Sequence, residues 1–214
     1  MNRHRRSLSF LLLLFVLPLS AAPPADEDRR LAASVAAICA ADYRGDRAEL
    51  ARQAALLDAA PSKTHQIYRE YWTGFAFWRR AINGFNETPT PSDLVADLDR
   101  CAEHERKALA LDPELEDARS ALAGCLSGEM FLASQLTPEK KAEVFREGLA
   151  QMKLLEQKAD VNPRSLWIVG GKQMFAPPPF GGDAVRASAT YRRGLEAARR
   201  EALSAAGRPP WIPS

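Results

Sequence analysis

The chain has 214 residues and carries 29 basic and 27 acidic side chains, a formal net charge of +2. Three of the basic residues, Arg3, Arg5 and Arg6, belong to the first segment, and the rest of the chain carries 26 basic against 27 acidic side chains. Because nucleic-acid binding requires a basic footprint on the folded domain, this balance excludes nucleic acid as a partner. The remaining length suits one domain with a substantial core.

Residues 1–22 have the organisation of a signal peptide. The three arginines form a positive n-region, the apolar stretch 8–17 forms an h-region, and Ser20 and Ala22 supply the small residues that a signal peptidase requires. A stretch this short cannot cross a hydrocarbon core of ~30 Å, so it is not a membrane anchor. We expect cleavage after Ala22, export to the periplasm or the medium, and no transmembrane segment in the mature chain.

Helix signals begin directly after the leader, and region 23–60 is expected to form an N-terminal helical cap. An opening helix is predicted from about 26 to 41. Asp46, with Glu49 three residues later, has the spacing of a helix start, and Ser62 marks a further one.

Four later helix starts are marked by a capping residue followed by proline. The side-chain oxygen of Thr, Asp or Asn accepts a hydrogen bond from the first turn, and proline at the next position sacrifices none. The four pairs are Thr90-Pro91, Asp112-Pro113, Thr137-Pro138 and Asn162-Pro163. Asp183, after Gly181-Gly182, is expected to cap the last helix. These starts predict eight helices and an all-α fold class.

A five-residue pattern recurs on these predicted helices at 78–82, 105–109, 145–149 and 191–195. Arginine is second, a small residue fourth and an aliphatic residue fifth, and three copies begin with an aromatic residue. On a helix the first, fourth and fifth positions share one face, which we expect to be a reused packing face. Glu105 begins the second copy, which favours a degenerate repeat over a functional buried carboxylate.

The junction 108–113, followed by Ala118, Leu122 and Ala123, resembles the boundary between two tetratricopeptide repeats. A less faithful junction follows at 158–163, fifty residues later rather than the family's 34. The resemblance implies a right-handed α-solenoid of stacked helix-turn-helix repeats. The degenerate repeats would occupy 61–206, and the proline-rich end, 207–214, is expected to be an extended tail.

Three cysteines, Cys39, Cys101 and Cys125, would enter an oxidising compartment, in which one disulfide can form. Cys101 and Cys125 lie at similar distances on either side of the turn at Asp112-Pro113. In an antiparallel helix hairpin they would lie at the same height, so they are the favoured pair. Three unpaired buried thiols remain the alternative.

The candidate partner-binding residues are aromatic or basic side chains. In a repeat solenoid the first helix of each unit lines a concave face, which could hold an extended peptide or a helix. The residues selected for this role are Tyr68, Tyr71, Trp72, Arg164, Trp167 and Phe180. For the aromatic cluster the alternative is packing against neighbouring helices. For Phe180 the alternative is a simple turn, and the arginines of the last helix could equally be a solvated face.

No catalytic, cofactor-binding or metal-binding motif is recognisable. His65 and His104 are isolated in the sequence, and Glu103, His104 and Glu105 are expected to point to different sides of a helix. The sequence therefore predicts an exported, non-catalytic scaffold that binds a protein or peptide. The alternatives are a self-associating structural protein of the envelope and, less favoured, a hydrolase on a helical scaffold. The oligomeric state is left open.

Overall fold

The computed structural model describes residues 24–60, 63–158, 162–204 and 212, and within them it is all-helical, without strands. The predicted signal peptide and most of the predicted tail lie outside the described residues. Eight α-helices lie within the described ranges, which confirms the number expected from the sequence. They are α1 (Pro24–Arg44), α2 (Arg47–Asp58), α3 (Gln66–Gly84), α4 (Leu94–Leu111), α5 (Glu116–Phe131), α6 (Pro138–Lys158), α7 (Pro163–Phe175) and α8 (Ala184–Ser204), with short 3₁₀ turns at Ala133–Gln135 and Pro178–Phe180.

Four predicted helix caps are confirmed. Asp46 accepts a hydrogen bond from the amide of Glu49 at 3.0 Å. Asn162 accepts from the amides of Arg164 and Ser165 at 2.8 and 3.1 Å. Thr137 and Asp183 accept from the first turns of α6 and α8 in the same way. In each case the capping side chain directly precedes the helix, so the local sequence is enough to predict where the helix begins.

Two predicted starts are wrong, because Asp112 and Thr90 precede turns rather than helices. The Asp112 carboxylate accepts from the amide of Glu114 at 2.9 Å, a local turn bond, and α5 begins only at Glu116. Such turn bonds compete with helix formation. Likewise, α4 begins at Leu94 and not directly after Thr90. The residue before it, Asp93, forms an ion pair with Arg47 at 2.6 Å. The predicted start at Ser62 lies outside the described residues, and α3 begins at Gln66.

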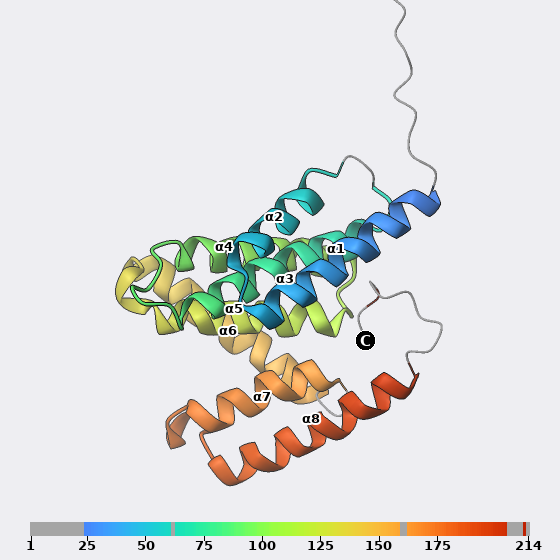
Figure 1. Cartoon of the computed structure of the whole chain (residues 1–214). Coiled ribbons are helices and arrows are strands. Elements are labelled where there is room, and N and C mark those ends of the chain that lie inside the picture. Colours follow the sequence, from blue (N-terminus) through green and yellow to red (C-terminus); the bar gives the residue numbers. More distant parts are fainter. Residues whose placement is uncertain (1–23, 61–62, 159–161, 205–211, 213–214) are drawn as a thin grey trace, which may run out of the picture.

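The helices form a stack in which each one packs against its neighbours in sequence. In addition, α1, α3, α5 and α7 contact one another in order, as the first helices of successive pairs do in a solenoid. Figure 1 shows the α7–α8 hairpin at one end of this stack. The two repeat junctions predicted at 108–113 and 158–163 coincide with the α4–α5 and α6–α7 connections. The repeat unit between them therefore comprises two long helices, α5 and α6.

Two apolar clusters hold the stack together. The larger one draws buried residues from α1 to α6. The smaller one lies under the α7–α8 hairpin and consists of Ala123, Met152, Leu155, Leu166, Val169 and Ala197. Because this smaller cluster contains only six buried residues of the described chain, the hairpin depends on polar contacts as well.

The recurring five-residue pattern does not mark one uniform packing face. In α4, Glu105 and Ala108 are buried as expected. In α6, however, Phe145 and Leu149 are exposed, and in α8 so is Leu195. The pattern falls on α3 as well as on α4, α6 and α8, so its copies occupy different places in the stack. This part of the sequence interpretation is therefore corrected.

A disulfide joins Cys101 in α4 to Cys125 in α5, the pair favoured by the spacing argument, with Cα atoms 6.4 Å apart. Cys39 on α1 is exposed and carries no disulfide. Among the described residues, none of the helices has the length and apolar character needed to span a bilayer.

Candidate functional site

Two of the six candidate binding residues are core residues. Tyr71 is 1 % exposed and Trp72 is 8 % exposed, and their rings pack edge to face with centroids 5.0 Å apart. Tyr68 is half-buried against the same apolar cluster. Aromatic packing between helices, the alternative interpretation of this cluster, therefore accounts for these residues, and the assignment of Tyr71 and Trp72 to an open surface is corrected.

Arg164 takes part in a polar junction beneath the α7–α8 hairpin. Its guanidinium lies 3.2 Å from the Glu201 carboxylate on α8 and 3.7 Å from that of Asp117 on α5. Asn162 donates a hydrogen bond to Asp117 at 2.8 Å, and the hydroxyls of Ser120 and Ser165 lie 3.0 Å apart. Arg164 thus ties three helices together, although part of its side chain is solvent-accessible.

Trp167 and Phe180 are the two candidates that lie on the surface. Trp167 is 63 % exposed on α7, and its ring centroid is 5.1 Å from that of Tyr191 on α8. Phe180 is 64 % exposed in the turn at the far end of the hairpin. That turn needs its glycines: Gly181 has φ +93°, and a Cβ on Gly182 would collide with the carbonyl oxygen of Ala176.

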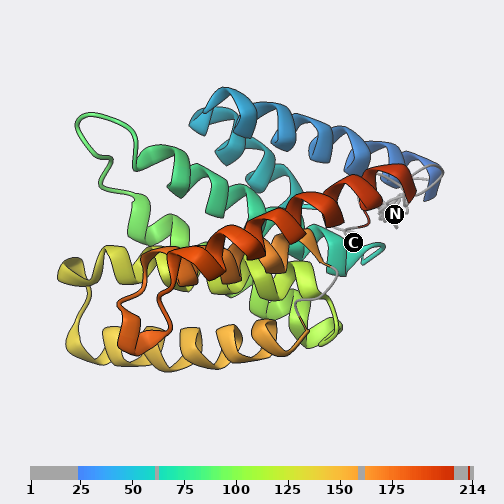
Figure 2. The ribbon, with the colours of Figure 1, turned by 90° about the horizontal axis from the view of Figure 1, so that it is seen from below.

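The structure also shows an exposed apolar row on α8 that the sequence analysis missed. Its residues follow one another at intervals of three and four: Tyr191, Leu195, Ala198 and Ala202. Leu195 is 61 % exposed, and Tyr191 is half-buried beside Trp167. The adjoining face of α8 packs on α7: the Thr190 hydroxyl donates to Gln173 at 2.7 Å, and Ala197 belongs to the same apolar cluster as Leu166 and Val169. Figure 2 views the molecule from the α8 side, and no other helix lies in front of α8.

This exposed row lies on a basic helix. The α8 segment contains five arginines and two glutamates. By helical geometry Arg192 and Arg199 flank the outer edge of the row, while Trp167 borders its inner edge. The signal for this surface was present in the sequence as a 3–4 spacing of apolar residues, but only the structure shows that α7 does not cover it.

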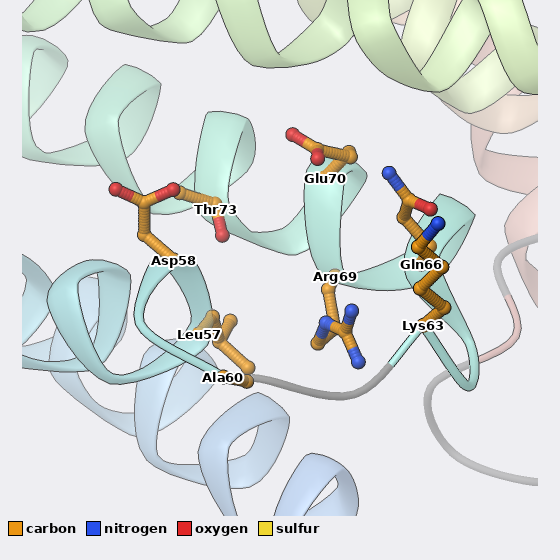
Figure 3. Close-up of a pocket in the computed structure, with 8 residues that line it drawn as sticks. All are labelled: Leu57, Asp58, Ala60, Lys63, Gln66, Arg69, Glu70 and Thr73. Carbon is orange, nitrogen blue, oxygen red and sulfur yellow. The ribbon is translucent and has the colours of Figure 1, made fainter.

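A second candidate site is a cavity of about 220 Å³ between the end of α2 and the first half of α3. It is lined by Leu57, Asp58, Ala60, Lys63, Gln66, Arg69, Glu70 and Thr73, drawn in Figure 3. His104 of α4 links two of the acidic groups: its Nδ1 is 2.7 Å from Glu70, and its Nε2 is 4.0 Å from Asp58. Three separate helices supply this set, so the sequence could not show it.

Glu105 is the most unusual buried group among the described residues. It is fully buried against Gly74, and neither carboxyl oxygen has a hydrogen-bond partner in the described part of the chain. Burial raises the pKa of Glu105 well above its usual range, and the nearby carboxylates of Asp117 and Glu70 raise it further. Burial and these neighbours therefore favour the neutral acid over the carboxylate.

Glu129 is a second buried carboxyl group, at the α5 end of the α5–α6 turn. Burial raises its pKa to about 7, even though the Lys140 ammonium group, 3.5 Å away, favours the ionised form. Asp99 also pairs with Lys140, at 2.7 Å, so the lysine is shared between two carboxylates.

Within the described part of the chain, no group of three or more histidine, cysteine, aspartate or glutamate side chains is arranged to hold a metal ion. His65, the other histidine of this part, lies 2.7 Å from Asp28 of α1 and is not among the residues that line the cavity. Comparison with known proteins gives no match to a family model, to a curated protein or to a solved structure.

Proposed function

We propose that the chain is an exported, non-catalytic scaffold of tetratricopeptide type that binds a protein partner through its α7–α8 hairpin. The observation that supports this function is the exposed apolar row of α8, with Leu195 61 % exposed beside Trp167. Burial of apolar surface contributes about 25 cal/mol per Å², so a partner that covers the row gains binding energy from it. Contiguous apolar patches on folded proteins mark such contact sites.

The chemistry of the hairpin selects the kind of partner. A row with 3–4 spacing fits the apolar face of a second helix, which would lie along α8 with residues in its gaps. The excess of arginine on α8 favours acidic residues at the edges of that helix. A second copy of this chain would place one basic α8 against another, so self-association through this surface is the less favourable arrangement.

Export is part of the proposal, and it rests on the n-region, h-region and small residues of 1–22. The Cys101–Cys125 disulfide supports it, because disulfides persist in oxidising compartments and are rare in the cytosol.

The test is chemical crosslinking of the exported chain in its native envelope, in three forms. Leu195→Arg places a charge in the exposed row of α8, and Leu149→Arg places the same charge on an exposed apolar position of α6. We expect one stoichiometric protein partner, captured by the unaltered chain and by Leu149→Arg but lost with Leu195→Arg.

Capture that survives Leu195→Arg would refute the assignment to the hairpin. Crosslinks made only between copies of the chain would support the envelope structural protein instead, and sedimentation across a concentration series would then show concentration-dependent oligomers.

A further inference from the structure

The cavity between α2 and α3 is formed by helices other than those of the proposed docking surface. It belongs to the second and third helices, whereas the apolar row belongs to the eighth. Its lining is mainly polar, which distinguishes it from the apolar surface of the hairpin. It therefore requires an explanation of its own.

One part of the cavity is anionic and fixed in position. Glu70 is largely buried, and its contact with the His104 ring at 2.7 Å holds the carboxylate in place. His104 is itself buried and stacks on Phe77, with ring planes 17° apart. Asp58 adds a second, more exposed carboxylate on the other side of the same ring.

Two cationic side chains, Lys63 and Arg69, also line the cavity. Figure 3 shows the Lys63 and Gln66 side chains at one end of the cavity and those of Asp58 and Thr73 at the other. Arg69 donates to the carbonyl oxygen of Thr64 at 2.6 Å, which fixes the segment that carries Lys63. Lys63 is exposed, and it lines the cavity.

The geometry points to a binding site for a small zwitterion of amino-acid size, with its ammonium group at Glu70 and its carboxylate at Lys63. The formal charges of the cavity balance, with two carboxylates against Lys63 and Arg69. A dianion such as phosphate would meet the two carboxylates, and an apolar ligand would find little apolar lining. At about 220 Å³ the space is below the roughly 300–1,000 Å³ of clefts that take drug-sized ligands.

The test is an NMR titration of the full chain, purified after export, with L-glutamine as the probe. Its side-chain amide is matched to Thr73, which lines the cavity at the end away from Lys63. We expect saturable shifts of backbone amides between 57 and 73, with a dissociation constant in the millimolar range or below. N-acetyl-L-glutamine, which lacks the ammonium group, should bind at least about tenfold more weakly, and so should the methyl ester.

Glu70→Gln should abolish binding, because it removes the fixed carboxylate. The matched control is Glu103→Gln, which changes the same charge on the surface of α4, where Glu103 pairs with Lys107 at 2.7 Å. The control should bind like the unaltered chain. Thermal melts of both variants separate a lost site from a lost fold, and Lys63→Ala, at an exposed position, gives a second variant that keeps the fold.

The inference is overturned if L-glutamine gives no saturable shifts in the unaltered chain. It is also overturned if the acetylated probe binds equally well, or if a folded Glu70→Gln variant binds like Glu103→Gln. These outcomes do not touch the proposed docking function, which depends on α7 and α8.

Discussion

At the scale of single residues, Glu105 departs furthest from an ordinary core position. A buried polar group without a hydrogen-bond partner costs roughly 1–3 kcal/mol, and an ionised one costs more. Glu105 is fully buried with both oxygens unpaired among the described residues, and the pattern of the chain places an aromatic side chain at the equivalent position elsewhere. The interpretation of Glu105 as a degenerate repeat position stays a prediction. Because the side chain is buried, its effect on the free energy of unfolding can be measured.

Replacement of Glu105 by methionine should therefore stabilise the fold. Because burial raises the folded-state pKa, ionisation of Glu105 is unfavourable in the folded chain, and stability is lost as pH rises above the normal glutamate range. We expect Glu105→Met to raise the free energy of unfolding by roughly 1–3 kcal/mol, with a larger gain at about pH 8 than at about pH 5. Urea unfolding at both pH values measures this. Glu103→Met on the surface is the control, and a loss of stability in Glu105→Met at both pH values would contradict the argument.

Glu129 allows a direct measurement of a shifted pKa. We expect the side-chain carboxyl carbon of Glu129 to titrate with a midpoint of about 7, followed by ¹³C NMR with assignment from Glu129→Gln. The folded-state pKa is raised, so the contribution of this group to stability is lost between the normal glutamate pKa and about 7. Exposed glutamates in the same spectra serve as the internal control. A midpoint in the ordinary range would mean that the Lys140 contact outweighs burial.

At the scale of elements, helix starts are predictable from the sequence where a single side chain caps the first turn of the helix. Asp46 and Asn162 directly precede their helices, and both predictions are confirmed. Asp112 has the same local signal, but its carboxylate accepts a hydrogen bond from the amide two residues later, and α5 begins only at Glu116. A capping residue before proline is thus compatible with either outcome, and the sequence does not contain the contacts that decide between them.

The candidate sites were less predictable, because they depend on which faces of the helices are covered. Tyr71 and Trp72 were selected for their aromatic character, yet neighbouring helices bury both. Trp167 was selected on the same basis and is exposed. The His104 contacts to Asp58 and Glu70 join α4 to α2 and α3, and no spacing in a single sequence indicates such a set.

The α7–α8 hairpin should be the element most sensitive to the loss of a single polar residue. Asn162 both caps α7 and donates to the buried carboxylate of Asp117 at 2.8 Å. We expect Asn162→Ala to destabilise the hairpin by roughly 1–2 kcal/mol. Hydrogen exchange should speed up for amides of α7 and α8 but not for those of α3 and α4.

Thr137→Ala is the matched control for this effect, because Thr137 also caps a helix but does so at the surface, through one bond of 3.3 Å. Equal acceleration of exchange in the two variants would show that Asn162 acts only as a cap and not as a link to α5.

At the scale of the whole molecule, the Cys101–Cys125 disulfide fastens the α4–α5 pair in the middle of the stack. Closing a loop of 24 residues in sequence should contribute about 3–4 kcal/mol, mainly by restricting the unfolded chain. We therefore expect thermal unfolding to occur at a clearly lower temperature under reducing conditions, by calorimetry. Cys39→Ser is the control and should leave the melting temperature of the oxidised protein unchanged. A fall in melting temperature of the same size in Cys39→Ser, without any reducing agent, would show that Cys39 has a structural role.

The same linear order separates the two proposed sites. The zwitterion cavity belongs to α2 and α3 and the docking surface to α7 and α8, so the two sites share no lining residue. Because each helix contacts mainly its neighbours, we regard the two sites as energetically separate.

The exposure of Trp167 also gives the molecule a built-in optical reporter. Its indole is 63 % exposed at the inner edge of the α8 row, whereas that of Trp72 is 8 % exposed in the core. A helix that docks along α8 would remove water from the Trp167 ring, shift its emission to shorter wavelength and protect it from a dissolved quencher such as acrylamide. Trp72 would keep the same emission throughout, so the part of the fluorescence that is lost in Trp167→Phe can report occupancy of the hairpin without any attached label.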